Sequence, residues 1–93
     1  MTPAKVPRSQ RVLILIDFIN PLDFPGAEKL AAPALAAARA TARLRDRLDG
    51  DGVAVIYAND NYGVWQSDFH SLVTQCLGRD DTSGAIARLL APR

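Results

Sequence analysis

The sequence lacks the features that mark several common classes of protein. It contains a single cysteine, Cys76, so no internal disulfide can form, and a reducing, cytoplasmic setting is expected. Its 11 basic and 10 acidic residues nearly cancel, which gives no indication of a nucleic-acid partner. No apolar stretch is long enough for a signal peptide or a membrane span. We therefore expect neither a disulfide scaffold nor a protein that acts on nucleic acids or membranes.

Motifs for bound cofactors and metals are also missing. No glycine-rich phosphate loop follows either predicted strand, which argues against a nucleotide site. The segment Asp17–Ile19 lacks the second acidic residue that paired-aspartate phosphatases and phosphate-receiver domains require. Asp60 and His70 suggest a metal, but they are far apart in sequence and Tyr62 stands where a second histidine is needed. We predict no cofactor and no metal.

The composition is that of one globular domain. The chain has 93 residues, of which 48% are hydrophobic and 23% charged. Residues 1–10 are predicted to form a flexible tail, because Lys5 and Arg8 stand there among two prolines. The folded part is expected to begin at Arg11.

The stretch around which the chain is organised is a run of five aliphatic residues, Val12–Ile16. Such a run predicts a strand buried on both faces, as in parallel sheets. Asp17 follows at once, and ligands of open parallel α/β sheets bind beyond the carboxyl ends of the strands. Asp17 is therefore a candidate functional residue, or else it only stabilises the turn that follows.

A long helix is predicted from Pro33 to about Leu48. Ala32 precedes a proline and so avoids helical geometry, whereas proline suits the first position of a helix. The face expected to be buried comprises Ala37, Thr41, Leu44 and Leu48. A second stripe comprises Arg39, Arg43 and Arg47, which we interpret as a solvated face, with phosphate binding as the alternative.

A second strand is predicted over Val53–Ala58, and it completes a βαβ unit with parallel strands. Polar residues follow this strand at Asn59–Asn61, as Asp17 follows the first. Because neighbouring parallel strands end at one edge of a sheet, these residues are expected to converge there. This convergence is the main indication of a site in the sequence.

Two further helices are predicted after a loop. One spans Asp68–Leu77 with Ser67 as its N-cap, and the last opens around Asp80–Ser83. Cys76 lies on the apolar stripe of the first of these, so we interpret it as a small core residue and not as a nucleophile. In the loop, Trp65 lines a pocket or simply covers the edge of the sheet.

Only two strands of the buried parallel type are present, and two strands make a poor independent sheet. The free edge of an aliphatic strand is prone to pair with other chains. We therefore expect the chain to form about half of a larger α/β domain, and to self-associate or to pair with a separate C-terminal half.

Two segments carry a resemblance to a known family. The strand with Asp17–Asn20 and Asp23–Gly26 resembles the opening of the isochorismatase-like cysteine hydrolases. The second strand with Asn59–Phe69 is similar to one bacterial branch of that family. The resemblance covers 11–93 and implies the N-terminal half of the family domain, a Rossmann-like parallel sheet flanked by helices.

The resemblance implies a hydrolase that acts on amides or related small molecules through an aspartate, a lysine and a cysteine. Asp17 matches the aspartate, the general base, and the substrate contacts are expected at Phe24, Asn61 and Trp65. The lysine and cysteine have no counterpart here, so the chain alone is predicted to be inactive. The alternative is a non-catalytic, truncated fragment or subunit that needs a partner supplying the rest of the sheet.

Overall fold

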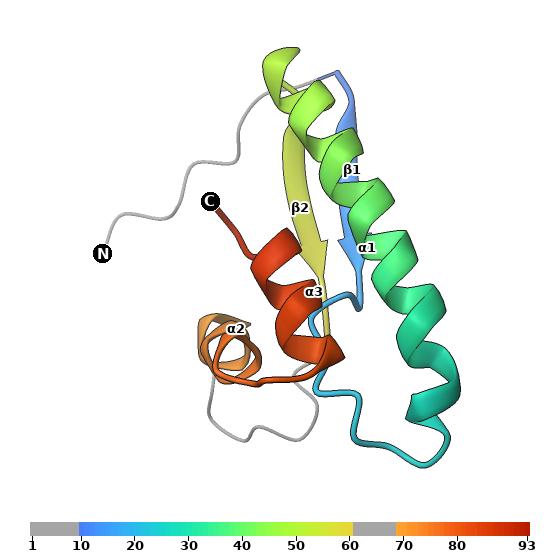
Figure 1. Ribbon diagram of the computed structural model, residues 1–93. Coiled ribbons are helices and arrows are strands. Elements are labelled where there is room, and N and C mark those ends of the chain that lie inside the picture. The colour runs from blue at the N-terminus through green and yellow to red at the C-terminus, as the bar shows by residue number, and fades with distance from the viewer. Residues whose placement is uncertain (1–9, 61–68) are drawn as a thin grey trace.

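The computed structural model describes residues 10–60 and 69–93, and within them the chain adopts the α/β fold that the sequence predicts (Figure 1). The elements in chain order are β1 (Val12–Ile16), α1 (Ala27–Gly50), β2 (Ala54–Ala58), α2 (Phe69–Leu77) and α3 (Thr82–Leu90). None of these helices is both long and apolar enough to cross a membrane, among the residues described.

The two strands form a parallel sheet in which α1 is the connection between them. Val12 lies beside Ala54 at one end, and Ile16 lies beside Ala58 at the other. Figure 1 shows α1 and α3 in front of the strands, on the same face of the sheet. Both strands therefore end at one edge, as the sequence pattern predicts for a βαβ unit.

The sheet is covered on one face only, so the prediction that β1 is buried on both faces is wrong for the described chain. Leu15 is 1% exposed, whereas Ile14 and Ile16 are 49% and 65% exposed. Side chains alternate between the two faces of a strand, and the helices cover only the face to which Leu15 points. The open face consists of apolar side chains, mainly Val12, Ile14, Ile16 and Ile56, and we call it the open sheet face.

The core lies between the covered face of the sheet and the three helices. Its fully buried side chains come from every layer: Leu15 from β1, Leu72 from α2 and Leu90 from α3. Ala38 is the residue of α1 that enters it, and Ile19 joins it from the loop after β1. Ile19 therefore anchors the loop that follows β1 to the core.

Helix α1 begins six residues before Pro33, which corrects the predicted start. Gly26 precedes the helix with a φ of 87°, a left-handed conformation that glycine adopts without strain. Pro33 lies inside the helix and is exposed, and its missing N–H costs the helix one main-chain hydrogen bond. The alanines on both sides of Pro33 favour helix strongly enough to continue through it.

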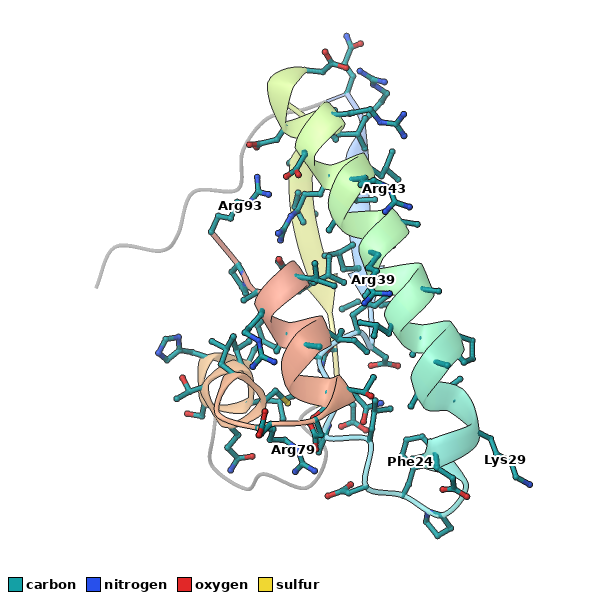
Figure 2. All side chains as sticks on the ribbon, in the orientation of Figure 1. Phe24, Lys29, Arg39, Arg43, Arg79 and Arg93 are labelled. Carbon is teal, nitrogen blue, oxygen red and sulfur yellow. The ribbon has the colours of Figure 1, made fainter. Side chains whose placement is uncertain are left out.

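The buried face of α1 is also rotated from the predicted one. Ala37 is exposed, and Thr41, Leu44 and Leu48 are only partly buried. The buried residues are Ala27, Ala38 and Arg45. The stripe of Arg39, Arg43 and Arg47 is exposed, as predicted for a solvated face, and Figure 2 shows Arg39 and Arg43 along this helix.

The remaining elements differ from prediction only at their ends. β2 begins at Ala54, one residue late, and the predicted N-cap Ser67 lies outside the described residues. The buried stripe that the sequence predicts for α2 comprises Phe69, Leu72, Val73, Cys76 and Leu77, but Leu77 is 38% exposed and does not join the core. Helix α3 begins at Thr82 and is capped by Asp81, whose Oδ1 accepts a hydrogen bond from the Gly84 N–H at 3.1 Å.

The cap of α3 predicts a pH-dependent contribution to stability. Hydrogen bonds from the Ser83 hydroxyl and the Arg79 guanidinium, with that from Gly84, lower the pKa of Asp81 from 3.8 to about 2. Asp81→Ala is expected to lower the free energy of unfolding at pH 7 by about 1 kcal/mol, as loss of a helix cap does. Because the pKa is lower in the folded state, this contribution is present above pH 4 and is lost as the pH falls toward 2.

Thermal unfolding followed by circular dichroism at pH 7 and at pH 2 measures the effect. Asp80→Ala is the matched control, since it removes a neighbouring exposed carboxylate that does not cap the helix. An equal loss of stability in both variants, or a loss in Asp81→Ala that is unchanged at pH 2, would contradict the assignment.

Candidate functional site

The predicted convergence of polar groups at the carboxyl edge of the sheet is confirmed for the described residues. Asp17 directly follows β1, and Asn59 and Asp60 directly follow β2. The Asp60 N–H donates to Asp17 Oδ1 at 3.0 Å, and the Asp17 N–H donates to the Ala58 carbonyl at 2.9 Å. The ends of the two strands are thus joined through both main chain and side chain.

The backbone turns sharply at Asp17. Its φ is 56°, in the left-handed region that few residues other than glycine occupy, although aspartate and asparagine tolerate it. Leu22 has a φ of 54°, and its N–H is held by Asn20 Oδ1 at 2.8 Å. Two left-handed residues within six positions turn the chain away from β1 and leave the Asp17 side chain exposed at the edge of the sheet. An exposed carboxylate there is accessible to a reacting group.

The structure places Phe24 in a hollow that Asp17 does not line. Phe24 is 40% exposed near the start of α1, as Figure 2 shows, and it lines a cavity of about 340 Å³. The other walls include Leu22, Asp23 and Glu28, and Asp17 is not among them. The other two predicted substrate contacts, Asn61 and Trp65, lie outside the described residues.

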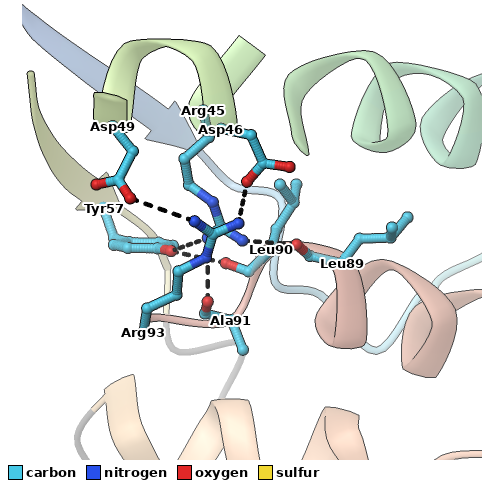
Figure 3. Close-up of polar contacts among 8 residues, drawn as sticks. All are labelled: Arg45, Asp46, Asp49, Tyr57, Leu89, Leu90, Ala91 and Arg93. Carbon is cyan, nitrogen blue, oxygen red and sulfur yellow. Dashed lines mark hydrogen bonds and ion pairs between the residues drawn. The ribbon is translucent and has the colours of Figure 1, made fainter. Parts of the chain in front are cut away.

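A larger hollow, of about 370 Å³, lies at the opposite end of the sheet, where β2 begins. Arg45 lies in its wall and is 5% exposed, a burial that the sequence pattern did not indicate. Its guanidinium donates to the carbonyls of Leu89 and Ala91 at 2.8 and 3.0 Å, and to the Tyr57 hydroxyl at 3.0 Å (Figure 3). These bonds occupy carbonyls that the end of a helix leaves unpaired, so the role of Arg45 is to fasten α3 to α1 and β2.

The described chain holds two other groups of the expected catalytic types, Lys29 and Cys76, and neither is in a setting that favours catalysis. Lys29 is exposed on α1, and Lys5 lies outside the described residues. Cys76 is fully buried in the core, and this burial raises the pKa of its thiol, an effect that the nearby Arg79 partly opposes. A thiol with a raised pKa is a poor nucleophile, which agrees with its interpretation as a core residue.

Burial of Cys76 predicts slow reaction with thiol reagents. In the native chain, labelling by Ellman's reagent is expected to be at least about a hundredfold slower than in guanidinium chloride, because labelling requires opening of the core. The absorbance of the released thiolate measures both rates, and the unfolded chain is the control. Stoichiometric labelling of the native chain within seconds would show that the thiol is accessible and reactive.

No group of three or more histidine, cysteine or acidic side chains could hold a metal among residues 10–60 and 69–93. His70 is exposed on α2, and Tyr62 lies in the part that is not described. The absence of a metal site remains a prediction from the sequence.

Comparison with known proteins supports the resemblance seen in the sequence. The chain is similar to the uncharacterized isochorismatase family protein YaaI of Bacillus subtilis (strain 168), with 27% identity over 85 residues. The similarity covers 91% of this chain and 46% of the relative, so the chain spans about half the length of the curated relative it matches. No family model and no solved structure matches the chain. The similarity to the isochorismatase family predicted from the sequence is thereby confirmed.

Proposed function

We propose that this chain supplies the general base of an isochorismatase-like cysteine hydrolase, and that Asp17 is that base. The observation that carries the proposal is the position of the Asp17 carboxylate, which is exposed at the carboxyl edge of the sheet and held by the Asp60 N–H at 3.0 Å. Ligands of open parallel sheets bind at this edge. The similarity to an isochorismatase family protein supports the same reaction class.

In the proposed reaction Asp17 accepts the proton of a cysteine thiol. The thiolate attacks the carbonyl carbon of a small amide or a related substrate, and the bond to the leaving group breaks as that group takes up a proton. Water then attacks the acyl-cysteine, releases the acid and regenerates the thiol. The cysteine and the supporting lysine come from outside these 93 residues, because Cys76 is buried in the core and Lys29 is on the surface of α1.

A second candidate function is that of a non-catalytic subunit that binds a partner. The open sheet face favours it, since neighbouring exposed apolar side chains, of which Ile16 is 65% exposed, mark a surface that binds another protein. In this case the partner completes the sheet, and the Asp17 carboxylate only stabilises the turn after β1.

One experiment separates the two functions. The chain is co-expressed with the part of the relative that it does not match, and the product is assayed with small amides, including nicotinamide and N-carbamoyl compounds. Hydrolysis by the pair but by neither part alone supports the hydrolase. A stable complex that hydrolyses none of them supports the binding subunit, and failure to form any complex contradicts both.

A further inference from the structure

The Asn59 side chain joins the loop after β1 to the segment after β2. Its Nδ2 donates to the Ile19 carbonyl at 2.9 Å, and its Oδ1 accepts from the Ile19 N–H at 3.2 Å. One carboxamide thus pairs with both main-chain groups of a single residue 40 positions away. Only asparagine and glutamine carry a donor and an acceptor that can pair in this way, and asparagine has the shorter reach.

This pairing meets a need created by the turn at Asp17. The left-handed conformation of Asp17 takes the chain out of the sheet, so the strand ladder can no longer pair the groups that follow it. Ile19 is fully buried in the core, and buried main-chain groups are costly when left without partners. Asn59 supplies both partners and so fixes the position of the loop relative to β2.

The same side chain acts on the group that holds the Asp17 carboxylate. Asn59 Nδ2 also donates to the Asp60 carbonyl at 2.6 Å, and the Asp60 N–H is the donor to Asp17 Oδ1. Asn59 therefore bonds to the segments on both sides of the contact between Asp17 and Asp60. Within the part of the chain that the structure describes, no hydrogen bond reaches Asp17 Oδ2, which leaves that oxygen to accept a proton.

We propose that Asn59 is a positioning residue, which keeps Asp17 Oδ1 on the Asp60 amide and presents Oδ2 to the group that loses its proton. The inference rests on the proposed function of Asp17 as general base. Asn59 touches neither the substrate nor the reacting thiol in this scheme, and its effect is exerted through the two loops.

The first test measures local opening in the 93-residue chain. Asn59→Asp keeps the shape of the side chain but replaces the donor by an acceptor that faces two carbonyls, and Asn59→Ser is a smaller second variant. Hydrogen exchange followed by mass spectrometry is expected to speed up about tenfold in 17–20 and 58–60, as loss of a hydrogen bond in this setting predicts. The control is Asn20→Ala, which breaks only the local bond to the Leu22 N–H and should leave 58–60 unchanged. Unchanged exchange in both Asn59 variants overturns the proposal.

The second test uses the co-expressed pair assayed for hydrolysis. Asn59→Asp is expected to lower kcat by about a hundredfold while KM changes less than twofold, because misplacement of a catalytic group by about 1 Å has an effect of that size. Full kcat in both Asn59 variants, with kcat lost in Asp17→Asn, overturns the positioning role and leaves the proposed function standing. Full kcat in Asp17→Asn overturns the proposed function itself. A kcat loss in Asn59→Asp that only follows unfolding at the assay temperature shows a structural role and also overturns the proposal.

Discussion

Asp17→Asn is expected to lower kcat of the co-expressed pair by about a hundred- to ten-thousandfold, the usual contribution of a general base. The substitution keeps the side-chain shape and the oxygen that accepts from the Asp60 N–H, so the loops after β1 and β2 should stay in place. What the amide loses is the capacity to accept a proton from a thiol. The expected result is therefore a folded but nearly inactive pair, measured as the initial rate of hydrolysis at saturating substrate.

A distant carboxylate provides the control for this result. Asp51→Asn removes an exposed carboxylate that directly follows α1 and does not line the hollow beside Phe24. It should leave kcat within about twofold of the parent value, since it alters no group that accepts the proton. Near-normal turnover in Asp17→Asn, or an equal loss in Asp51→Asn, would refute the role of Asp17.

The chain by itself is expected to run as a mixture of associated species and not as a sharp monomer. Within the described residues β1 pairs only with β2, which leaves main-chain groups along its other edge free to pair with another strand. The open sheet face adds exposed apolar surface next to that edge. At roughly 25 cal/mol per Å², covering a few hundred Å² of such surface is worth several kcal/mol, comparable to the stability of a small domain.

Size-exclusion chromatography with light scattering measures this association. Ile16→Lys places a charge on the open sheet face, where the parent side chain is 65% exposed, and is expected to shift the population toward monomer. Leu30→Lys is the matched control, because Leu30 is 46% exposed on α1, away from the sheet. A monomeric parent with cooperative thermal unfolding would show that the described elements suffice as a domain.

The strands and the edge at which they end could be predicted from sequence because they depend on local signals. The aliphatic run of β1 is bounded by Arg11 and Asp17, and the strand in the structure has the predicted limits, Val12–Ile16. The start of α1 was missed because a proline is a strong local signal that the surrounding alanines override. The burial of β1 on only one face could not be predicted from the sequence either, because it depends on which faces of the sheet the helices cover.

Arg45 and Asn59 show what local patterns cannot supply. A hydrophobicity pattern treats Arg45 as a surface residue, whereas its acceptors are carbonyls 44 and 46 positions along the chain. The position of Asn59 beside Asp17 followed from topology, but its pairing with Ile19 depends on the left-handed turn at Asp17. Both side chains are polar groups that bond to main-chain groups far away in the sequence. No periodic pattern in the sequence predicts such partners.

The hydrogen bonds from Arg45 to the end of α3 also determine where a further strand of the sheet would begin. They hold Leu89–Ala91 near the hollow where β2 begins, so a strand that followed would start at the amino end of the sheet and run parallel to β2. Because α3 lies on the same face as α1, a right-handed crossover would place that strand on the outer side of β2. The free edge of β1 would stay vacant after such an addition. A strand could pair with the free edge of β1 only after a later crossover over the opposite face of the sheet, where a right-handed connection leads the other way.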